Sequence, residues 1–146
     1  NVTSRELYHA ELDRAMPVKL GLLPLLNWLQ TERIPLAVAT STRHEWALKK
    51  LRKANILDYF QGMVCGDQVS LGKPHPEIFL TAASRINMEP AACVVLEDSD
   101  PGVRGAHAAG MRVIQVPDVK APSAEVLAFG HPVYPSLHEA HARLQL

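Results

Sequence analysis

The chain has 146 residues, of which 47% are hydrophobic and 21% are charged, as expected for one globular domain with a substantial core. Fifteen basic and fifteen acidic residues cancel, which argues against nucleic acid as a partner, because such partners favour a basic surplus. No apolar run approaches the length of a membrane helix and no signal-peptide pattern opens the sequence, so we expect no membrane partner.

Two cysteines occur, Cys65 and Cys93, and each lies within an apolar run. We therefore expect buried free thiols rather than a disulfide, as in a reducing compartment. These features together predict a cytoplasmic location.

In chain order, the sequence predicts helices that alternate with short strands. The first predicted helix covers residues 3–15 and begins with a Thr3-x-x-Glu6 capping box. Further helices are predicted over residues 20–32, 43–54, 76–86, 101–109 and 137–144, and apolar runs predict strands over residues 34–40, 63–66, 92–97 and 112–116. Such alternation is typical of βαβ units, so we expect an α/β fold with a three-layer, Rossmann-like parallel sheet.

Ligands of parallel sheets bind beyond the carboxyl ends of the strands, which makes the residues after each strand candidates for a site. Thr40, Ser41 and Thr42 follow the first apolar run and precede a helix, where hydroxyl and amide donors can bind an anion. Thr42 alone could instead be a plain helix cap. Lys73, between Gly and Pro, could reach a phosphate, or it could be an ordinary loop lysine.

Acidic residues follow the predicted strand over residues 92–97. Glu97, Asp98 and Asp100 form a carboxylate cluster, which is unfavourable unless a cation is present. Hard oxygen ligands suit Mg²⁺, which is commonly shared with a substrate phosphate. For Asp98 a metal role is favoured, whereas Asp100 is expected to cap the helix that Pro101 begins. Hydroxyls, a lysine and an acidic cluster together predict a site that supports a phosphoryl group.

Three segments resemble motifs of one enzyme family. "LAVATST", "GKPHPEIFLTAA" and "VVLEDSDPGVRGAHAAGM" are similar to the second, third and fourth motifs of the haloacid dehalogenase-like hydrolases. The resemblance extends over residues 16–116 and is strongest to the branch with a helical cap, which includes phosphoglycolate phosphatase, sugar-phosphate phosphatases and β-phosphoglucomutase.

The resemblance implies a role for each matching residue. Thr40 would hydrogen-bond the transferring phosphoryl group with help from the Ser41 backbone N–H, and Lys73 would neutralise phosphate and nucleophile together. Asp98 would bind Mg²⁺ directly, and Glu97 would contribute to the metal site through water.

The first motif of the family is absent from these residues. It reads Asp-x-Asp-x-Thr, with a nucleophile that becomes an aspartyl-phosphate and a general acid/base, but Asp98-Ser99-Asp100 is the only Asp-x-Asp and belongs to the fourth motif. The resemblance therefore implies that residues 1–15 are the last helix of the cap. Residues 16–146 would be a core that lacks its central first strand.

A sheet without its central strand would leave rows of backbone N–H and C=O groups without partners. Three explanations are open. The sequence is a fragment of a longer protein, which is the one we expect; a companion segment or a swapped chain completes the sheet; or the neighbouring strands close the gap.

The leading functional hypothesis is a Mg²⁺-dependent phosphatase of a small phosphorylated metabolite such as a sugar phosphate. It would act through an aspartyl-phosphate whose nucleophile is missing here, so this chain alone is expected to be inactive. A β-phosphoglucomutase-like phosphomutase and a non-catalytic phosphate-binding module are the alternatives.

Overall fold

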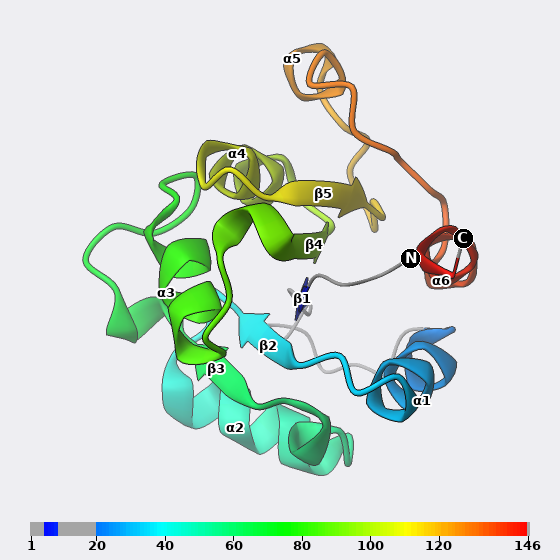
Figure 1. Ribbon diagram of the computed structural model, residues 1–146. Coiled ribbons are helices and arrows are strands. Elements are labelled where there is room, and N and C mark those ends of the chain that lie inside the picture. The colour runs from blue at the N-terminus through cyan, green and yellow to red at the C-terminus, as the bar shows by residue number, and fades with distance from the viewer. Residues whose placement is uncertain (1–4, 9–19, 146) are drawn as a thin grey trace.

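The computed structural model describes residues 5–8 and 20–145, and it contains a five-stranded parallel sheet with the strand order β3-β2-β1-β4-β5 (Figure 1). The strands are β1 Arg5–Tyr8, β2 Leu36–Ala39, β3 Gly62–Val64, β4 Cys93–Glu97 and β5 Arg112–Gln115. The α-helices are α1 Leu22–Thr31, α2 His44–Lys53, α3 Glu77–Arg85, α4 Asp100–Ala108, α5 Ala124–Leu127 and α6 Leu137–Leu144. Single 3₁₀ turns cover Leu57–Tyr59, Gly66–Gln68 and Pro90–Ala92.

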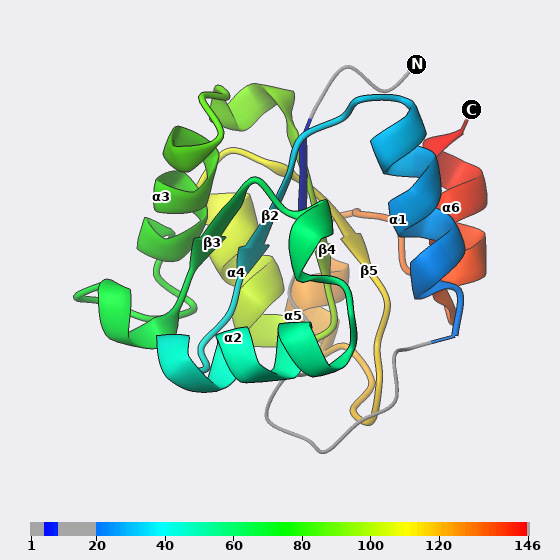
Figure 2. The same ribbon diagram turned by 90° about the horizontal axis from the view of Figure 1, so that it is seen from below.

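The three-layer α/β architecture expected from the sequence is confirmed. Alternate residues of β2, β4 and β5 enter two separate cores: Leu36 and Val38 of β2 face one core, whereas Ala37 and Ala39 face the other. Helices α1, α2 and α6 cover the first face and helices α3, α4 and α5 cover the second. Figure 2 shows α1 and α6 side by side at one end of the first layer.

The amino-terminal segment differs from the expectation. Arg5–Tyr8 forms strand β1, which pairs in parallel with both β2 and β4 at the centre of the sheet (Figure 1). The helix expected over residues 3–15 is therefore wrong at Arg5–Tyr8, and the rest of that range lies outside the described residues. The sheet position that we expected to be empty is occupied by the chain's own backbone.

Backbone pairing explains this outcome. Two parallel strands that face an empty central position would each bury a row of N–H and C=O groups without partners, and that cost exceeds the local preference of a capping pattern. A segment of four residues is enough to pair with β2 over residues 36–38 and with β4 over residues 93–96.

Other expectations hold more closely. The helices over α1, α2, α3, α4 and α6 and the strands over β2, β4 and β5 lie within a few residues of their predicted bounds, whereas the short helix α5 was not predicted. Cys65 and Cys93 are buried free thiols, as expected. Burial, followed by repulsion from Asp67, raises the pKa of Cys65 to about 11, so this thiol is a poor nucleophile near neutral pH. Among the described residues, no helix combines the length and apolarity needed to cross a bilayer.

A histidine in the first layer predicts how stability depends on pH. His141 of α6 lies 5.2 Å from Trp28 of α1, ring centre to ring centre, and its Nε2 is buried without a partner among the described residues. Burial, and then the nearby His138, lower the pKa of His141 below its ordinary value of 6.5. The neutral ring therefore stabilises the fold above about pH 6.5, and this contribution is lost as the pH falls through the lower folded pKa.

Urea denaturation at pH 7.5 and pH 5.5 tests this expectation. The wild-type chain should lose more stability between the two pH values than His141→Gln, whose side chain does not titrate. His138→Gln replaces an exposed ring on the same helix and should keep most of the wild-type difference. An equal pH response of wild type and His141→Gln would contradict the assignment.

Candidate active site

The candidate site lies at the carboxyl ends of β2 and β4, which flank β1 and run in the same direction. The chain leaves β2 at Thr40 and leaves β4 at Asp98, so the topology brings the two polar segments to one edge of the sheet. The loop that contains Lys73 reaches the same edge from the segment before α3.

The segment from Thr40 to Thr42 forms a tight turn in which Thr40 and Thr42 are buried and Ser41 is exposed. Thr40 is 1% exposed, its backbone N–H donates to the Val64 carbonyl at 3.0 Å, and its Oγ1 accepts from the Thr42 N–H at 3.1 Å. Gly66 donates its N–H to the Thr42 carbonyl, and a Cβ at Gly66 would lie 2.2 Å from the Ser41 carbonyl oxygen. Only glycine at this position permits so close an approach to the turn.

The alternative that Thr42 merely caps the next helix is wrong. Arg43 occupies the cap position of α2, and no side-chain cap bond is made there. The His44 N–H, in the first turn, instead donates to Asp67 Oδ1 at 2.9 Å, and this hydrogen bond lowers the pKa of Asp67. Asp67 comes from the 3₁₀ turn after β3. A carboxylate that is distant in sequence therefore accepts the hydrogen bond that the Thr42 hydroxyl would accept if it capped α2.

Lys73 is the cationic centre of the site. Its Nζ donates to Glu97 Oε2 at 3.0 Å and to the Ala39 carbonyl at 3.2 Å, and the two charged side chains are only 4% and 0% exposed. Its ammonium also lies 5.1 Å from the ring centre of Phe79. The interpretation of Lys73 as an ordinary loop lysine is therefore wrong, because this ammonium is held between the ends of β2 and β4.

The loop that carries Lys73 is fixed by a glutamate. Both carboxylate oxygens of Glu77 accept backbone hydrogen bonds, from the Ser70 N–H at 3.1 Å and the Leu71 N–H at 3.0 Å. These two bonds lower the pKa of Glu77 below its ordinary value. Glu77 thus stabilises the turn immediately before Lys73 from the first turn of α3.

Glu97 links this lysine to the turn that follows β4. Its Oε1 accepts from the Asp98 N–H at 3.0 Å, the Ser99 N–H at 3.2 Å and the Ser99 hydroxyl at 3.2 Å, while Oε2 accepts from Lys73. A Cβ at Gly102 would lie 1.9 Å from the Glu97 Cδ. The missing side chain of Gly102 therefore lets the first turn of α4 pack directly on this carboxylate.

The expectation that Asp100 caps α4 is wrong. Ser99 is the cap, and its Oγ accepts from the Gly102 N–H at 3.3 Å. Asp100 is the first helical residue, and its Oδ2 accepts from the Ser123 N–H at 3.0 Å. Burial alone would raise the pKa of Asp100, but the hydrogen bonds from Ser123 outweigh it and lower that pKa. Ser99 is the cap because its hydroxyl accepts from a backbone N–H in the first turn of the helix. The Asp100 carboxylate instead accepts from Ser123, in the segment before α5.

A hollow of about 220 Å³ lies beyond the end of β4, and Asp98, Asp100, Asp118 and Lys120 are among the residues that line it. Asp98 is 9% exposed and directly follows the strand. Asp118, which the sequence analysis did not select, reaches the hollow from the loop after β5. Three carboxylates, which follow the adjacent strands β4 and β5, therefore border one small space.

This donor set fits a magnesium ion. The described residues contain no group of three or more His, Cys, Asp or Glu side chains with metal-binding spacing. Mg²⁺ does not need such a group, because it typically binds one or two carboxylates and keeps several waters beside a phosphate. Asp98, with Asp118 on the same hollow, provides hard oxygen donors of that kind. Both oxygens of Glu97 are engaged elsewhere, so Glu97 suits the indirect metal role expected for it.

The structure thus brings Lys73, Glu97 and the end of β2 together, as the sequence analysis expected, and places Asp98 beside Glu97. Sequence reasoning missed residues that support these groups, namely Gly66, Asp67, Glu77, Gly102 and Asp118. The signal for Gly102 was present, since a glycine in the first turn of a helix costs stability unless something packs against it. No local pattern identified the contacts of Gly66 or Asp67.

Comparison with known proteins agrees with this arrangement. A family model described as "Haloacid dehalogenase-like hydrolase" matches residues 2–116. A phosphorylated carbohydrates phosphatase of Thermotoga maritima is 46% identical over 94 residues, which cover 64% of this chain and 44% of that protein. β-Phosphoglucomutase of Bacillus subtilis is 34% identical over 125 residues, which cover 80% of this chain and 54% of that protein. The chain thus spans about half the length of these curated relatives.

Solved structures show the same likeness. The crystal structure of CbbY from Rhodobacter sphaeroides in complex with phosphate superimposes with a TM-score of 0.78 at 28% sequence identity, and it covers 92% of this chain and 61% of that one. A haloacid dehalogenase family hydrolase from Deinococcus radiodurans with bound phosphate and sodium gives a TM-score of 0.78 at 27% identity, covering 88% and 59%.

Proposed function

Because the chain belongs to the haloacid dehalogenase-like hydrolases, we propose that it forms the phosphate- and Mg²⁺-binding part of a phosphatase that acts on a small phosphorylated metabolite. The observation that carries the proposal is the buried Lys73, held by Glu97 and by the Ala39 carbonyl at the strand ends. The names of two relatives, a phosphorylated carbohydrates phosphatase and a fructose-1-phosphate phosphatase of Escherichia coli, support a sugar phosphate as the substrate class.

The residues around Lys73 have complementary tasks. The Thr40 hydroxyl accepts from the Thr42 N–H, so its own hydrogen can be donated to a phosphoryl oxygen, and the Ser41 backbone N–H is the neighbouring donor. The ammonium of Lys73 balances the negative charge that collects on phosphoryl oxygens. Glu97 positions Lys73 and, through the Asp98 and Ser99 backbone N–H groups, the turn that follows β4.

Mg²⁺ would be held by Asp98, with Glu97 acting through water, and would neutralise phosphoryl charge. The attacking carboxylate and the general acid/base are proposed to come from an Asp-x-Asp-x-Thr motif in sequence outside these 146 residues. That motif would follow an apolar strand, which in the complete protein would take the central sheet position that Arg5–Tyr8 occupies here. Water would then hydrolyse the resulting aspartyl-phosphate.

An assay with p-nitrophenyl phosphate on the product of the complete reading frame tests the proposal. We expect activity that requires Mg²⁺ and falls by about 10²–10³-fold in Lys73→Ala and in Asp98→Ala, since each removes charge stabilisation at the phosphoryl group. Lys53→Ala, which replaces an exposed lysine at the end of α2, is the matched control. Undiminished activity in Lys73→Ala or Asp98→Ala would refute the assigned roles. A reading frame that begins at Asn1 would leave only phosphate binding for this product.

A phosphomutase is the second candidate, because β-phosphoglucomutase matches a larger share of this chain than the Thermotoga maritima phosphatase does. The two reactions differ in whether water or a sugar hydroxyl accepts the phosphoryl group. Incubation of the complete protein with β-glucose 1-phosphate separates them: release of inorganic phosphate identifies the phosphatase, and formation of glucose 6-phosphate identifies the mutase.

A further inference from the structure

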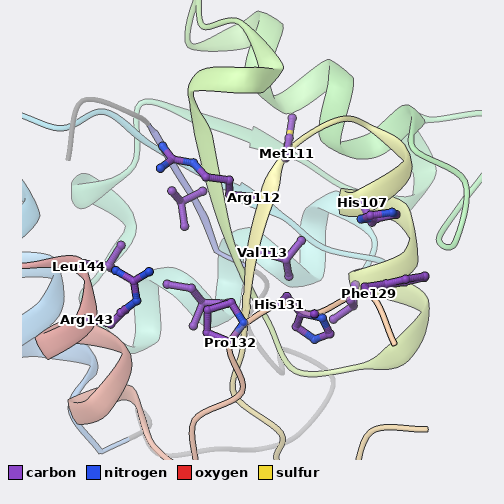
Figure 3. A pocket seen from close by; sticks show the side chains of 13 residues that line it. His107, Met111, Arg112, Val113, Phe129, His131, Pro132, Arg143 and Leu144 are labelled. Carbon is purple, nitrogen blue, oxygen red and sulfur yellow. The ribbon is translucent and has the colours of Figure 1, made fainter. Parts of the chain in front are cut away.

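A second cavity, of about 350 Å³, lies along the outer side of the edge strand β5 (Figure 3). Its walls come from the end of α4, the segment after α5 and the end of α6. None of the candidate site residues Thr40, Lys73 and Asp98 lines it. Its volume falls within the range of pockets that hold small molecules.

The cavity forms where a neighbouring segment separates from β5. The Gln115 N–H donates to the Pro132 carbonyl at 2.9 Å, and the Tyr134 N–H donates to the Gln115 carbonyl at 2.8 Å. Val113 lies two residues earlier on the same strand, so its peptide groups face the same side as those of Gln115. There the cavity, rather than residues 132–134, borders the strand, which leaves an edge that a ligand can approach.

The lining of this cavity carries positive charge. Arg112 and Arg143 border it together with His107 and His131, and no acidic residue does so among the described residues. Burial lowers the pKa of His131, so the arginines, not this ring, supply the charge. Arg112 and Arg143 are exposed, and neither takes part in an ion pair within the described part of the chain. Figure 3 shows the two arginines on one side of the cavity and His107, Phe129 and His131 on the other. Guanidinium groups bind carboxylates and phosphates with two hydrogen bonds each.

The opposite side is aromatic and contains a buried polar atom. Phe129 stacks on His107, with ring centres 4.3 Å apart and planes 5° from parallel. His131 Nε2 contacts Gln115 Oε1 at 2.7 Å, but His131 Nδ1 is buried without a hydrogen-bond partner in the described structure. A buried polar atom of this kind is costly unless a ligand or water satisfies it.

We propose that this cavity binds a small organic anion, whose oxyanion group contacts Arg112 and Arg143 and whose apolar body packs between Val113 and Phe129. The positive charge favours an anion, the apolar wall favours an organic one, and the volume of the cavity suits a small molecule. Inorganic phosphate has no apolar group that could pack against the aromatic side of the cavity, so it is not the expected occupant. The site is separate from the strand-end residues, so it does not depend on the proposed phosphatase activity.

Nuclear magnetic resonance titration of the ¹⁵N-labelled 146-residue chain tests the proposal with two probes, indole-3-acetate and 1-naphthyl phosphate. We expect saturable shifts of the Val113 and Phe129 amide signals, and the tighter probe identifies a carboxylate or a phosphate as the preferred head group. Indole-3-acetamide has the same ring without the charge and should bind at least about tenfold more weakly than indole-3-acetate. Equal affinity of acid and amide, or shifts confined to Ser41 and its neighbours, would refute the proposal.

Variants give an independent test. The double variant Arg112→Gln, Arg143→Gln should weaken binding of the better probe by about tenfold or more, whereas Arg52→Gln, an exposed arginine of α2, should leave it unchanged. Circular dichroism checks that each variant is folded. Wild-type affinity in a folded double variant would overturn the assignment. If the double variant does not fold, the comparison of acid and amide on the wild-type chain still decides.

Discussion

Replacing Lys73 with methionine is expected to lower the free energy of unfolding of this chain by about 3–5 kcal/mol. The Lys73 ammonium and the Glu97 carboxylate are 3.0 Å apart, and their side chains are 4% and 0% exposed. Loss of the cation leaves a carboxylate in the interior without its counter-charge, which is much more destabilising than the loss of an exposed ion pair. Urea denaturation followed by circular dichroism measures the effect.

A double-mutant cycle separates the pair from the other contacts of each residue. Glu97→Gln keeps an oxygen that can accept from the Asp98 and Ser99 N–H groups, so it removes mainly the charge. Combined with Lys73→Met, it should cost clearly less than the sum of the two single changes. Arg104→Met breaks the exposed ion pair with Glu125 and serves as the control, with an expected cost of about 0–1 kcal/mol. Additive single changes would show that the buried pair is not coupled.

Substitution of Gly102 by alanine is the second large effect that we expect. The added Cβ would lie 1.9 Å from the Glu97 Cδ, so the carboxylate or the first turn of α4 must move. Overpacking of this kind costs about 1–3 kcal/mol, and here the movement also strains the hydrogen bonds that Glu97 accepts. Gly72→Ala is the matched control, because a Cβ at Gly72 has no atom within 4 Å.

The measurement is urea denaturation of both glycine variants beside the wild type. Gly102→Ala should be destabilised, and Gly72→Ala should be close to wild type. Equal stability of the two variants would mean that α4 does not depend on close contact with Glu97. A Glu97→Ala background should reduce the penalty of Gly102→Ala, because it removes the atoms with which the new Cβ collides.

Apolar periodicity predicted the parts of the fold that are governed by burial. The runs that became β2, β4 and β5 are recognisable because helices cover both faces of the parallel sheet, so its strands are apolar on both sides. Once these strands are parallel, their carboxyl ends share an edge, which is why the proximity of Lys73 and Glu97 to the end of β2 could be expected from sequence.

The rest depended on contacts between segments that are distant in sequence. The residues of β1, Arg5–Tyr8, include two charges and lie in a helix-like capping pattern, so only the unfilled pairing of β2 and β4 makes them a strand. Likewise, Asp67, rather than the expected Thr42, accepts from a backbone N–H in the first turn of α2. Asp100 accepts from the Ser123 N–H and does not cap α4. In each case a long-range hydrogen bond outweighs a local preference.

The central claim, that the strand-end site binds phosphate, is tested most directly by titrating inorganic phosphate into the ¹⁵N-labelled chain with and without Mg²⁺. We expect saturable shifts of the Ser41, Thr42 and Lys73 amide signals that are stronger with Mg²⁺ and that are lost in a folded Lys73→Met variant. Absence of these shifts at millimolar phosphate, or the same shifts in Lys73→Met as in the wild type, would contradict the claim.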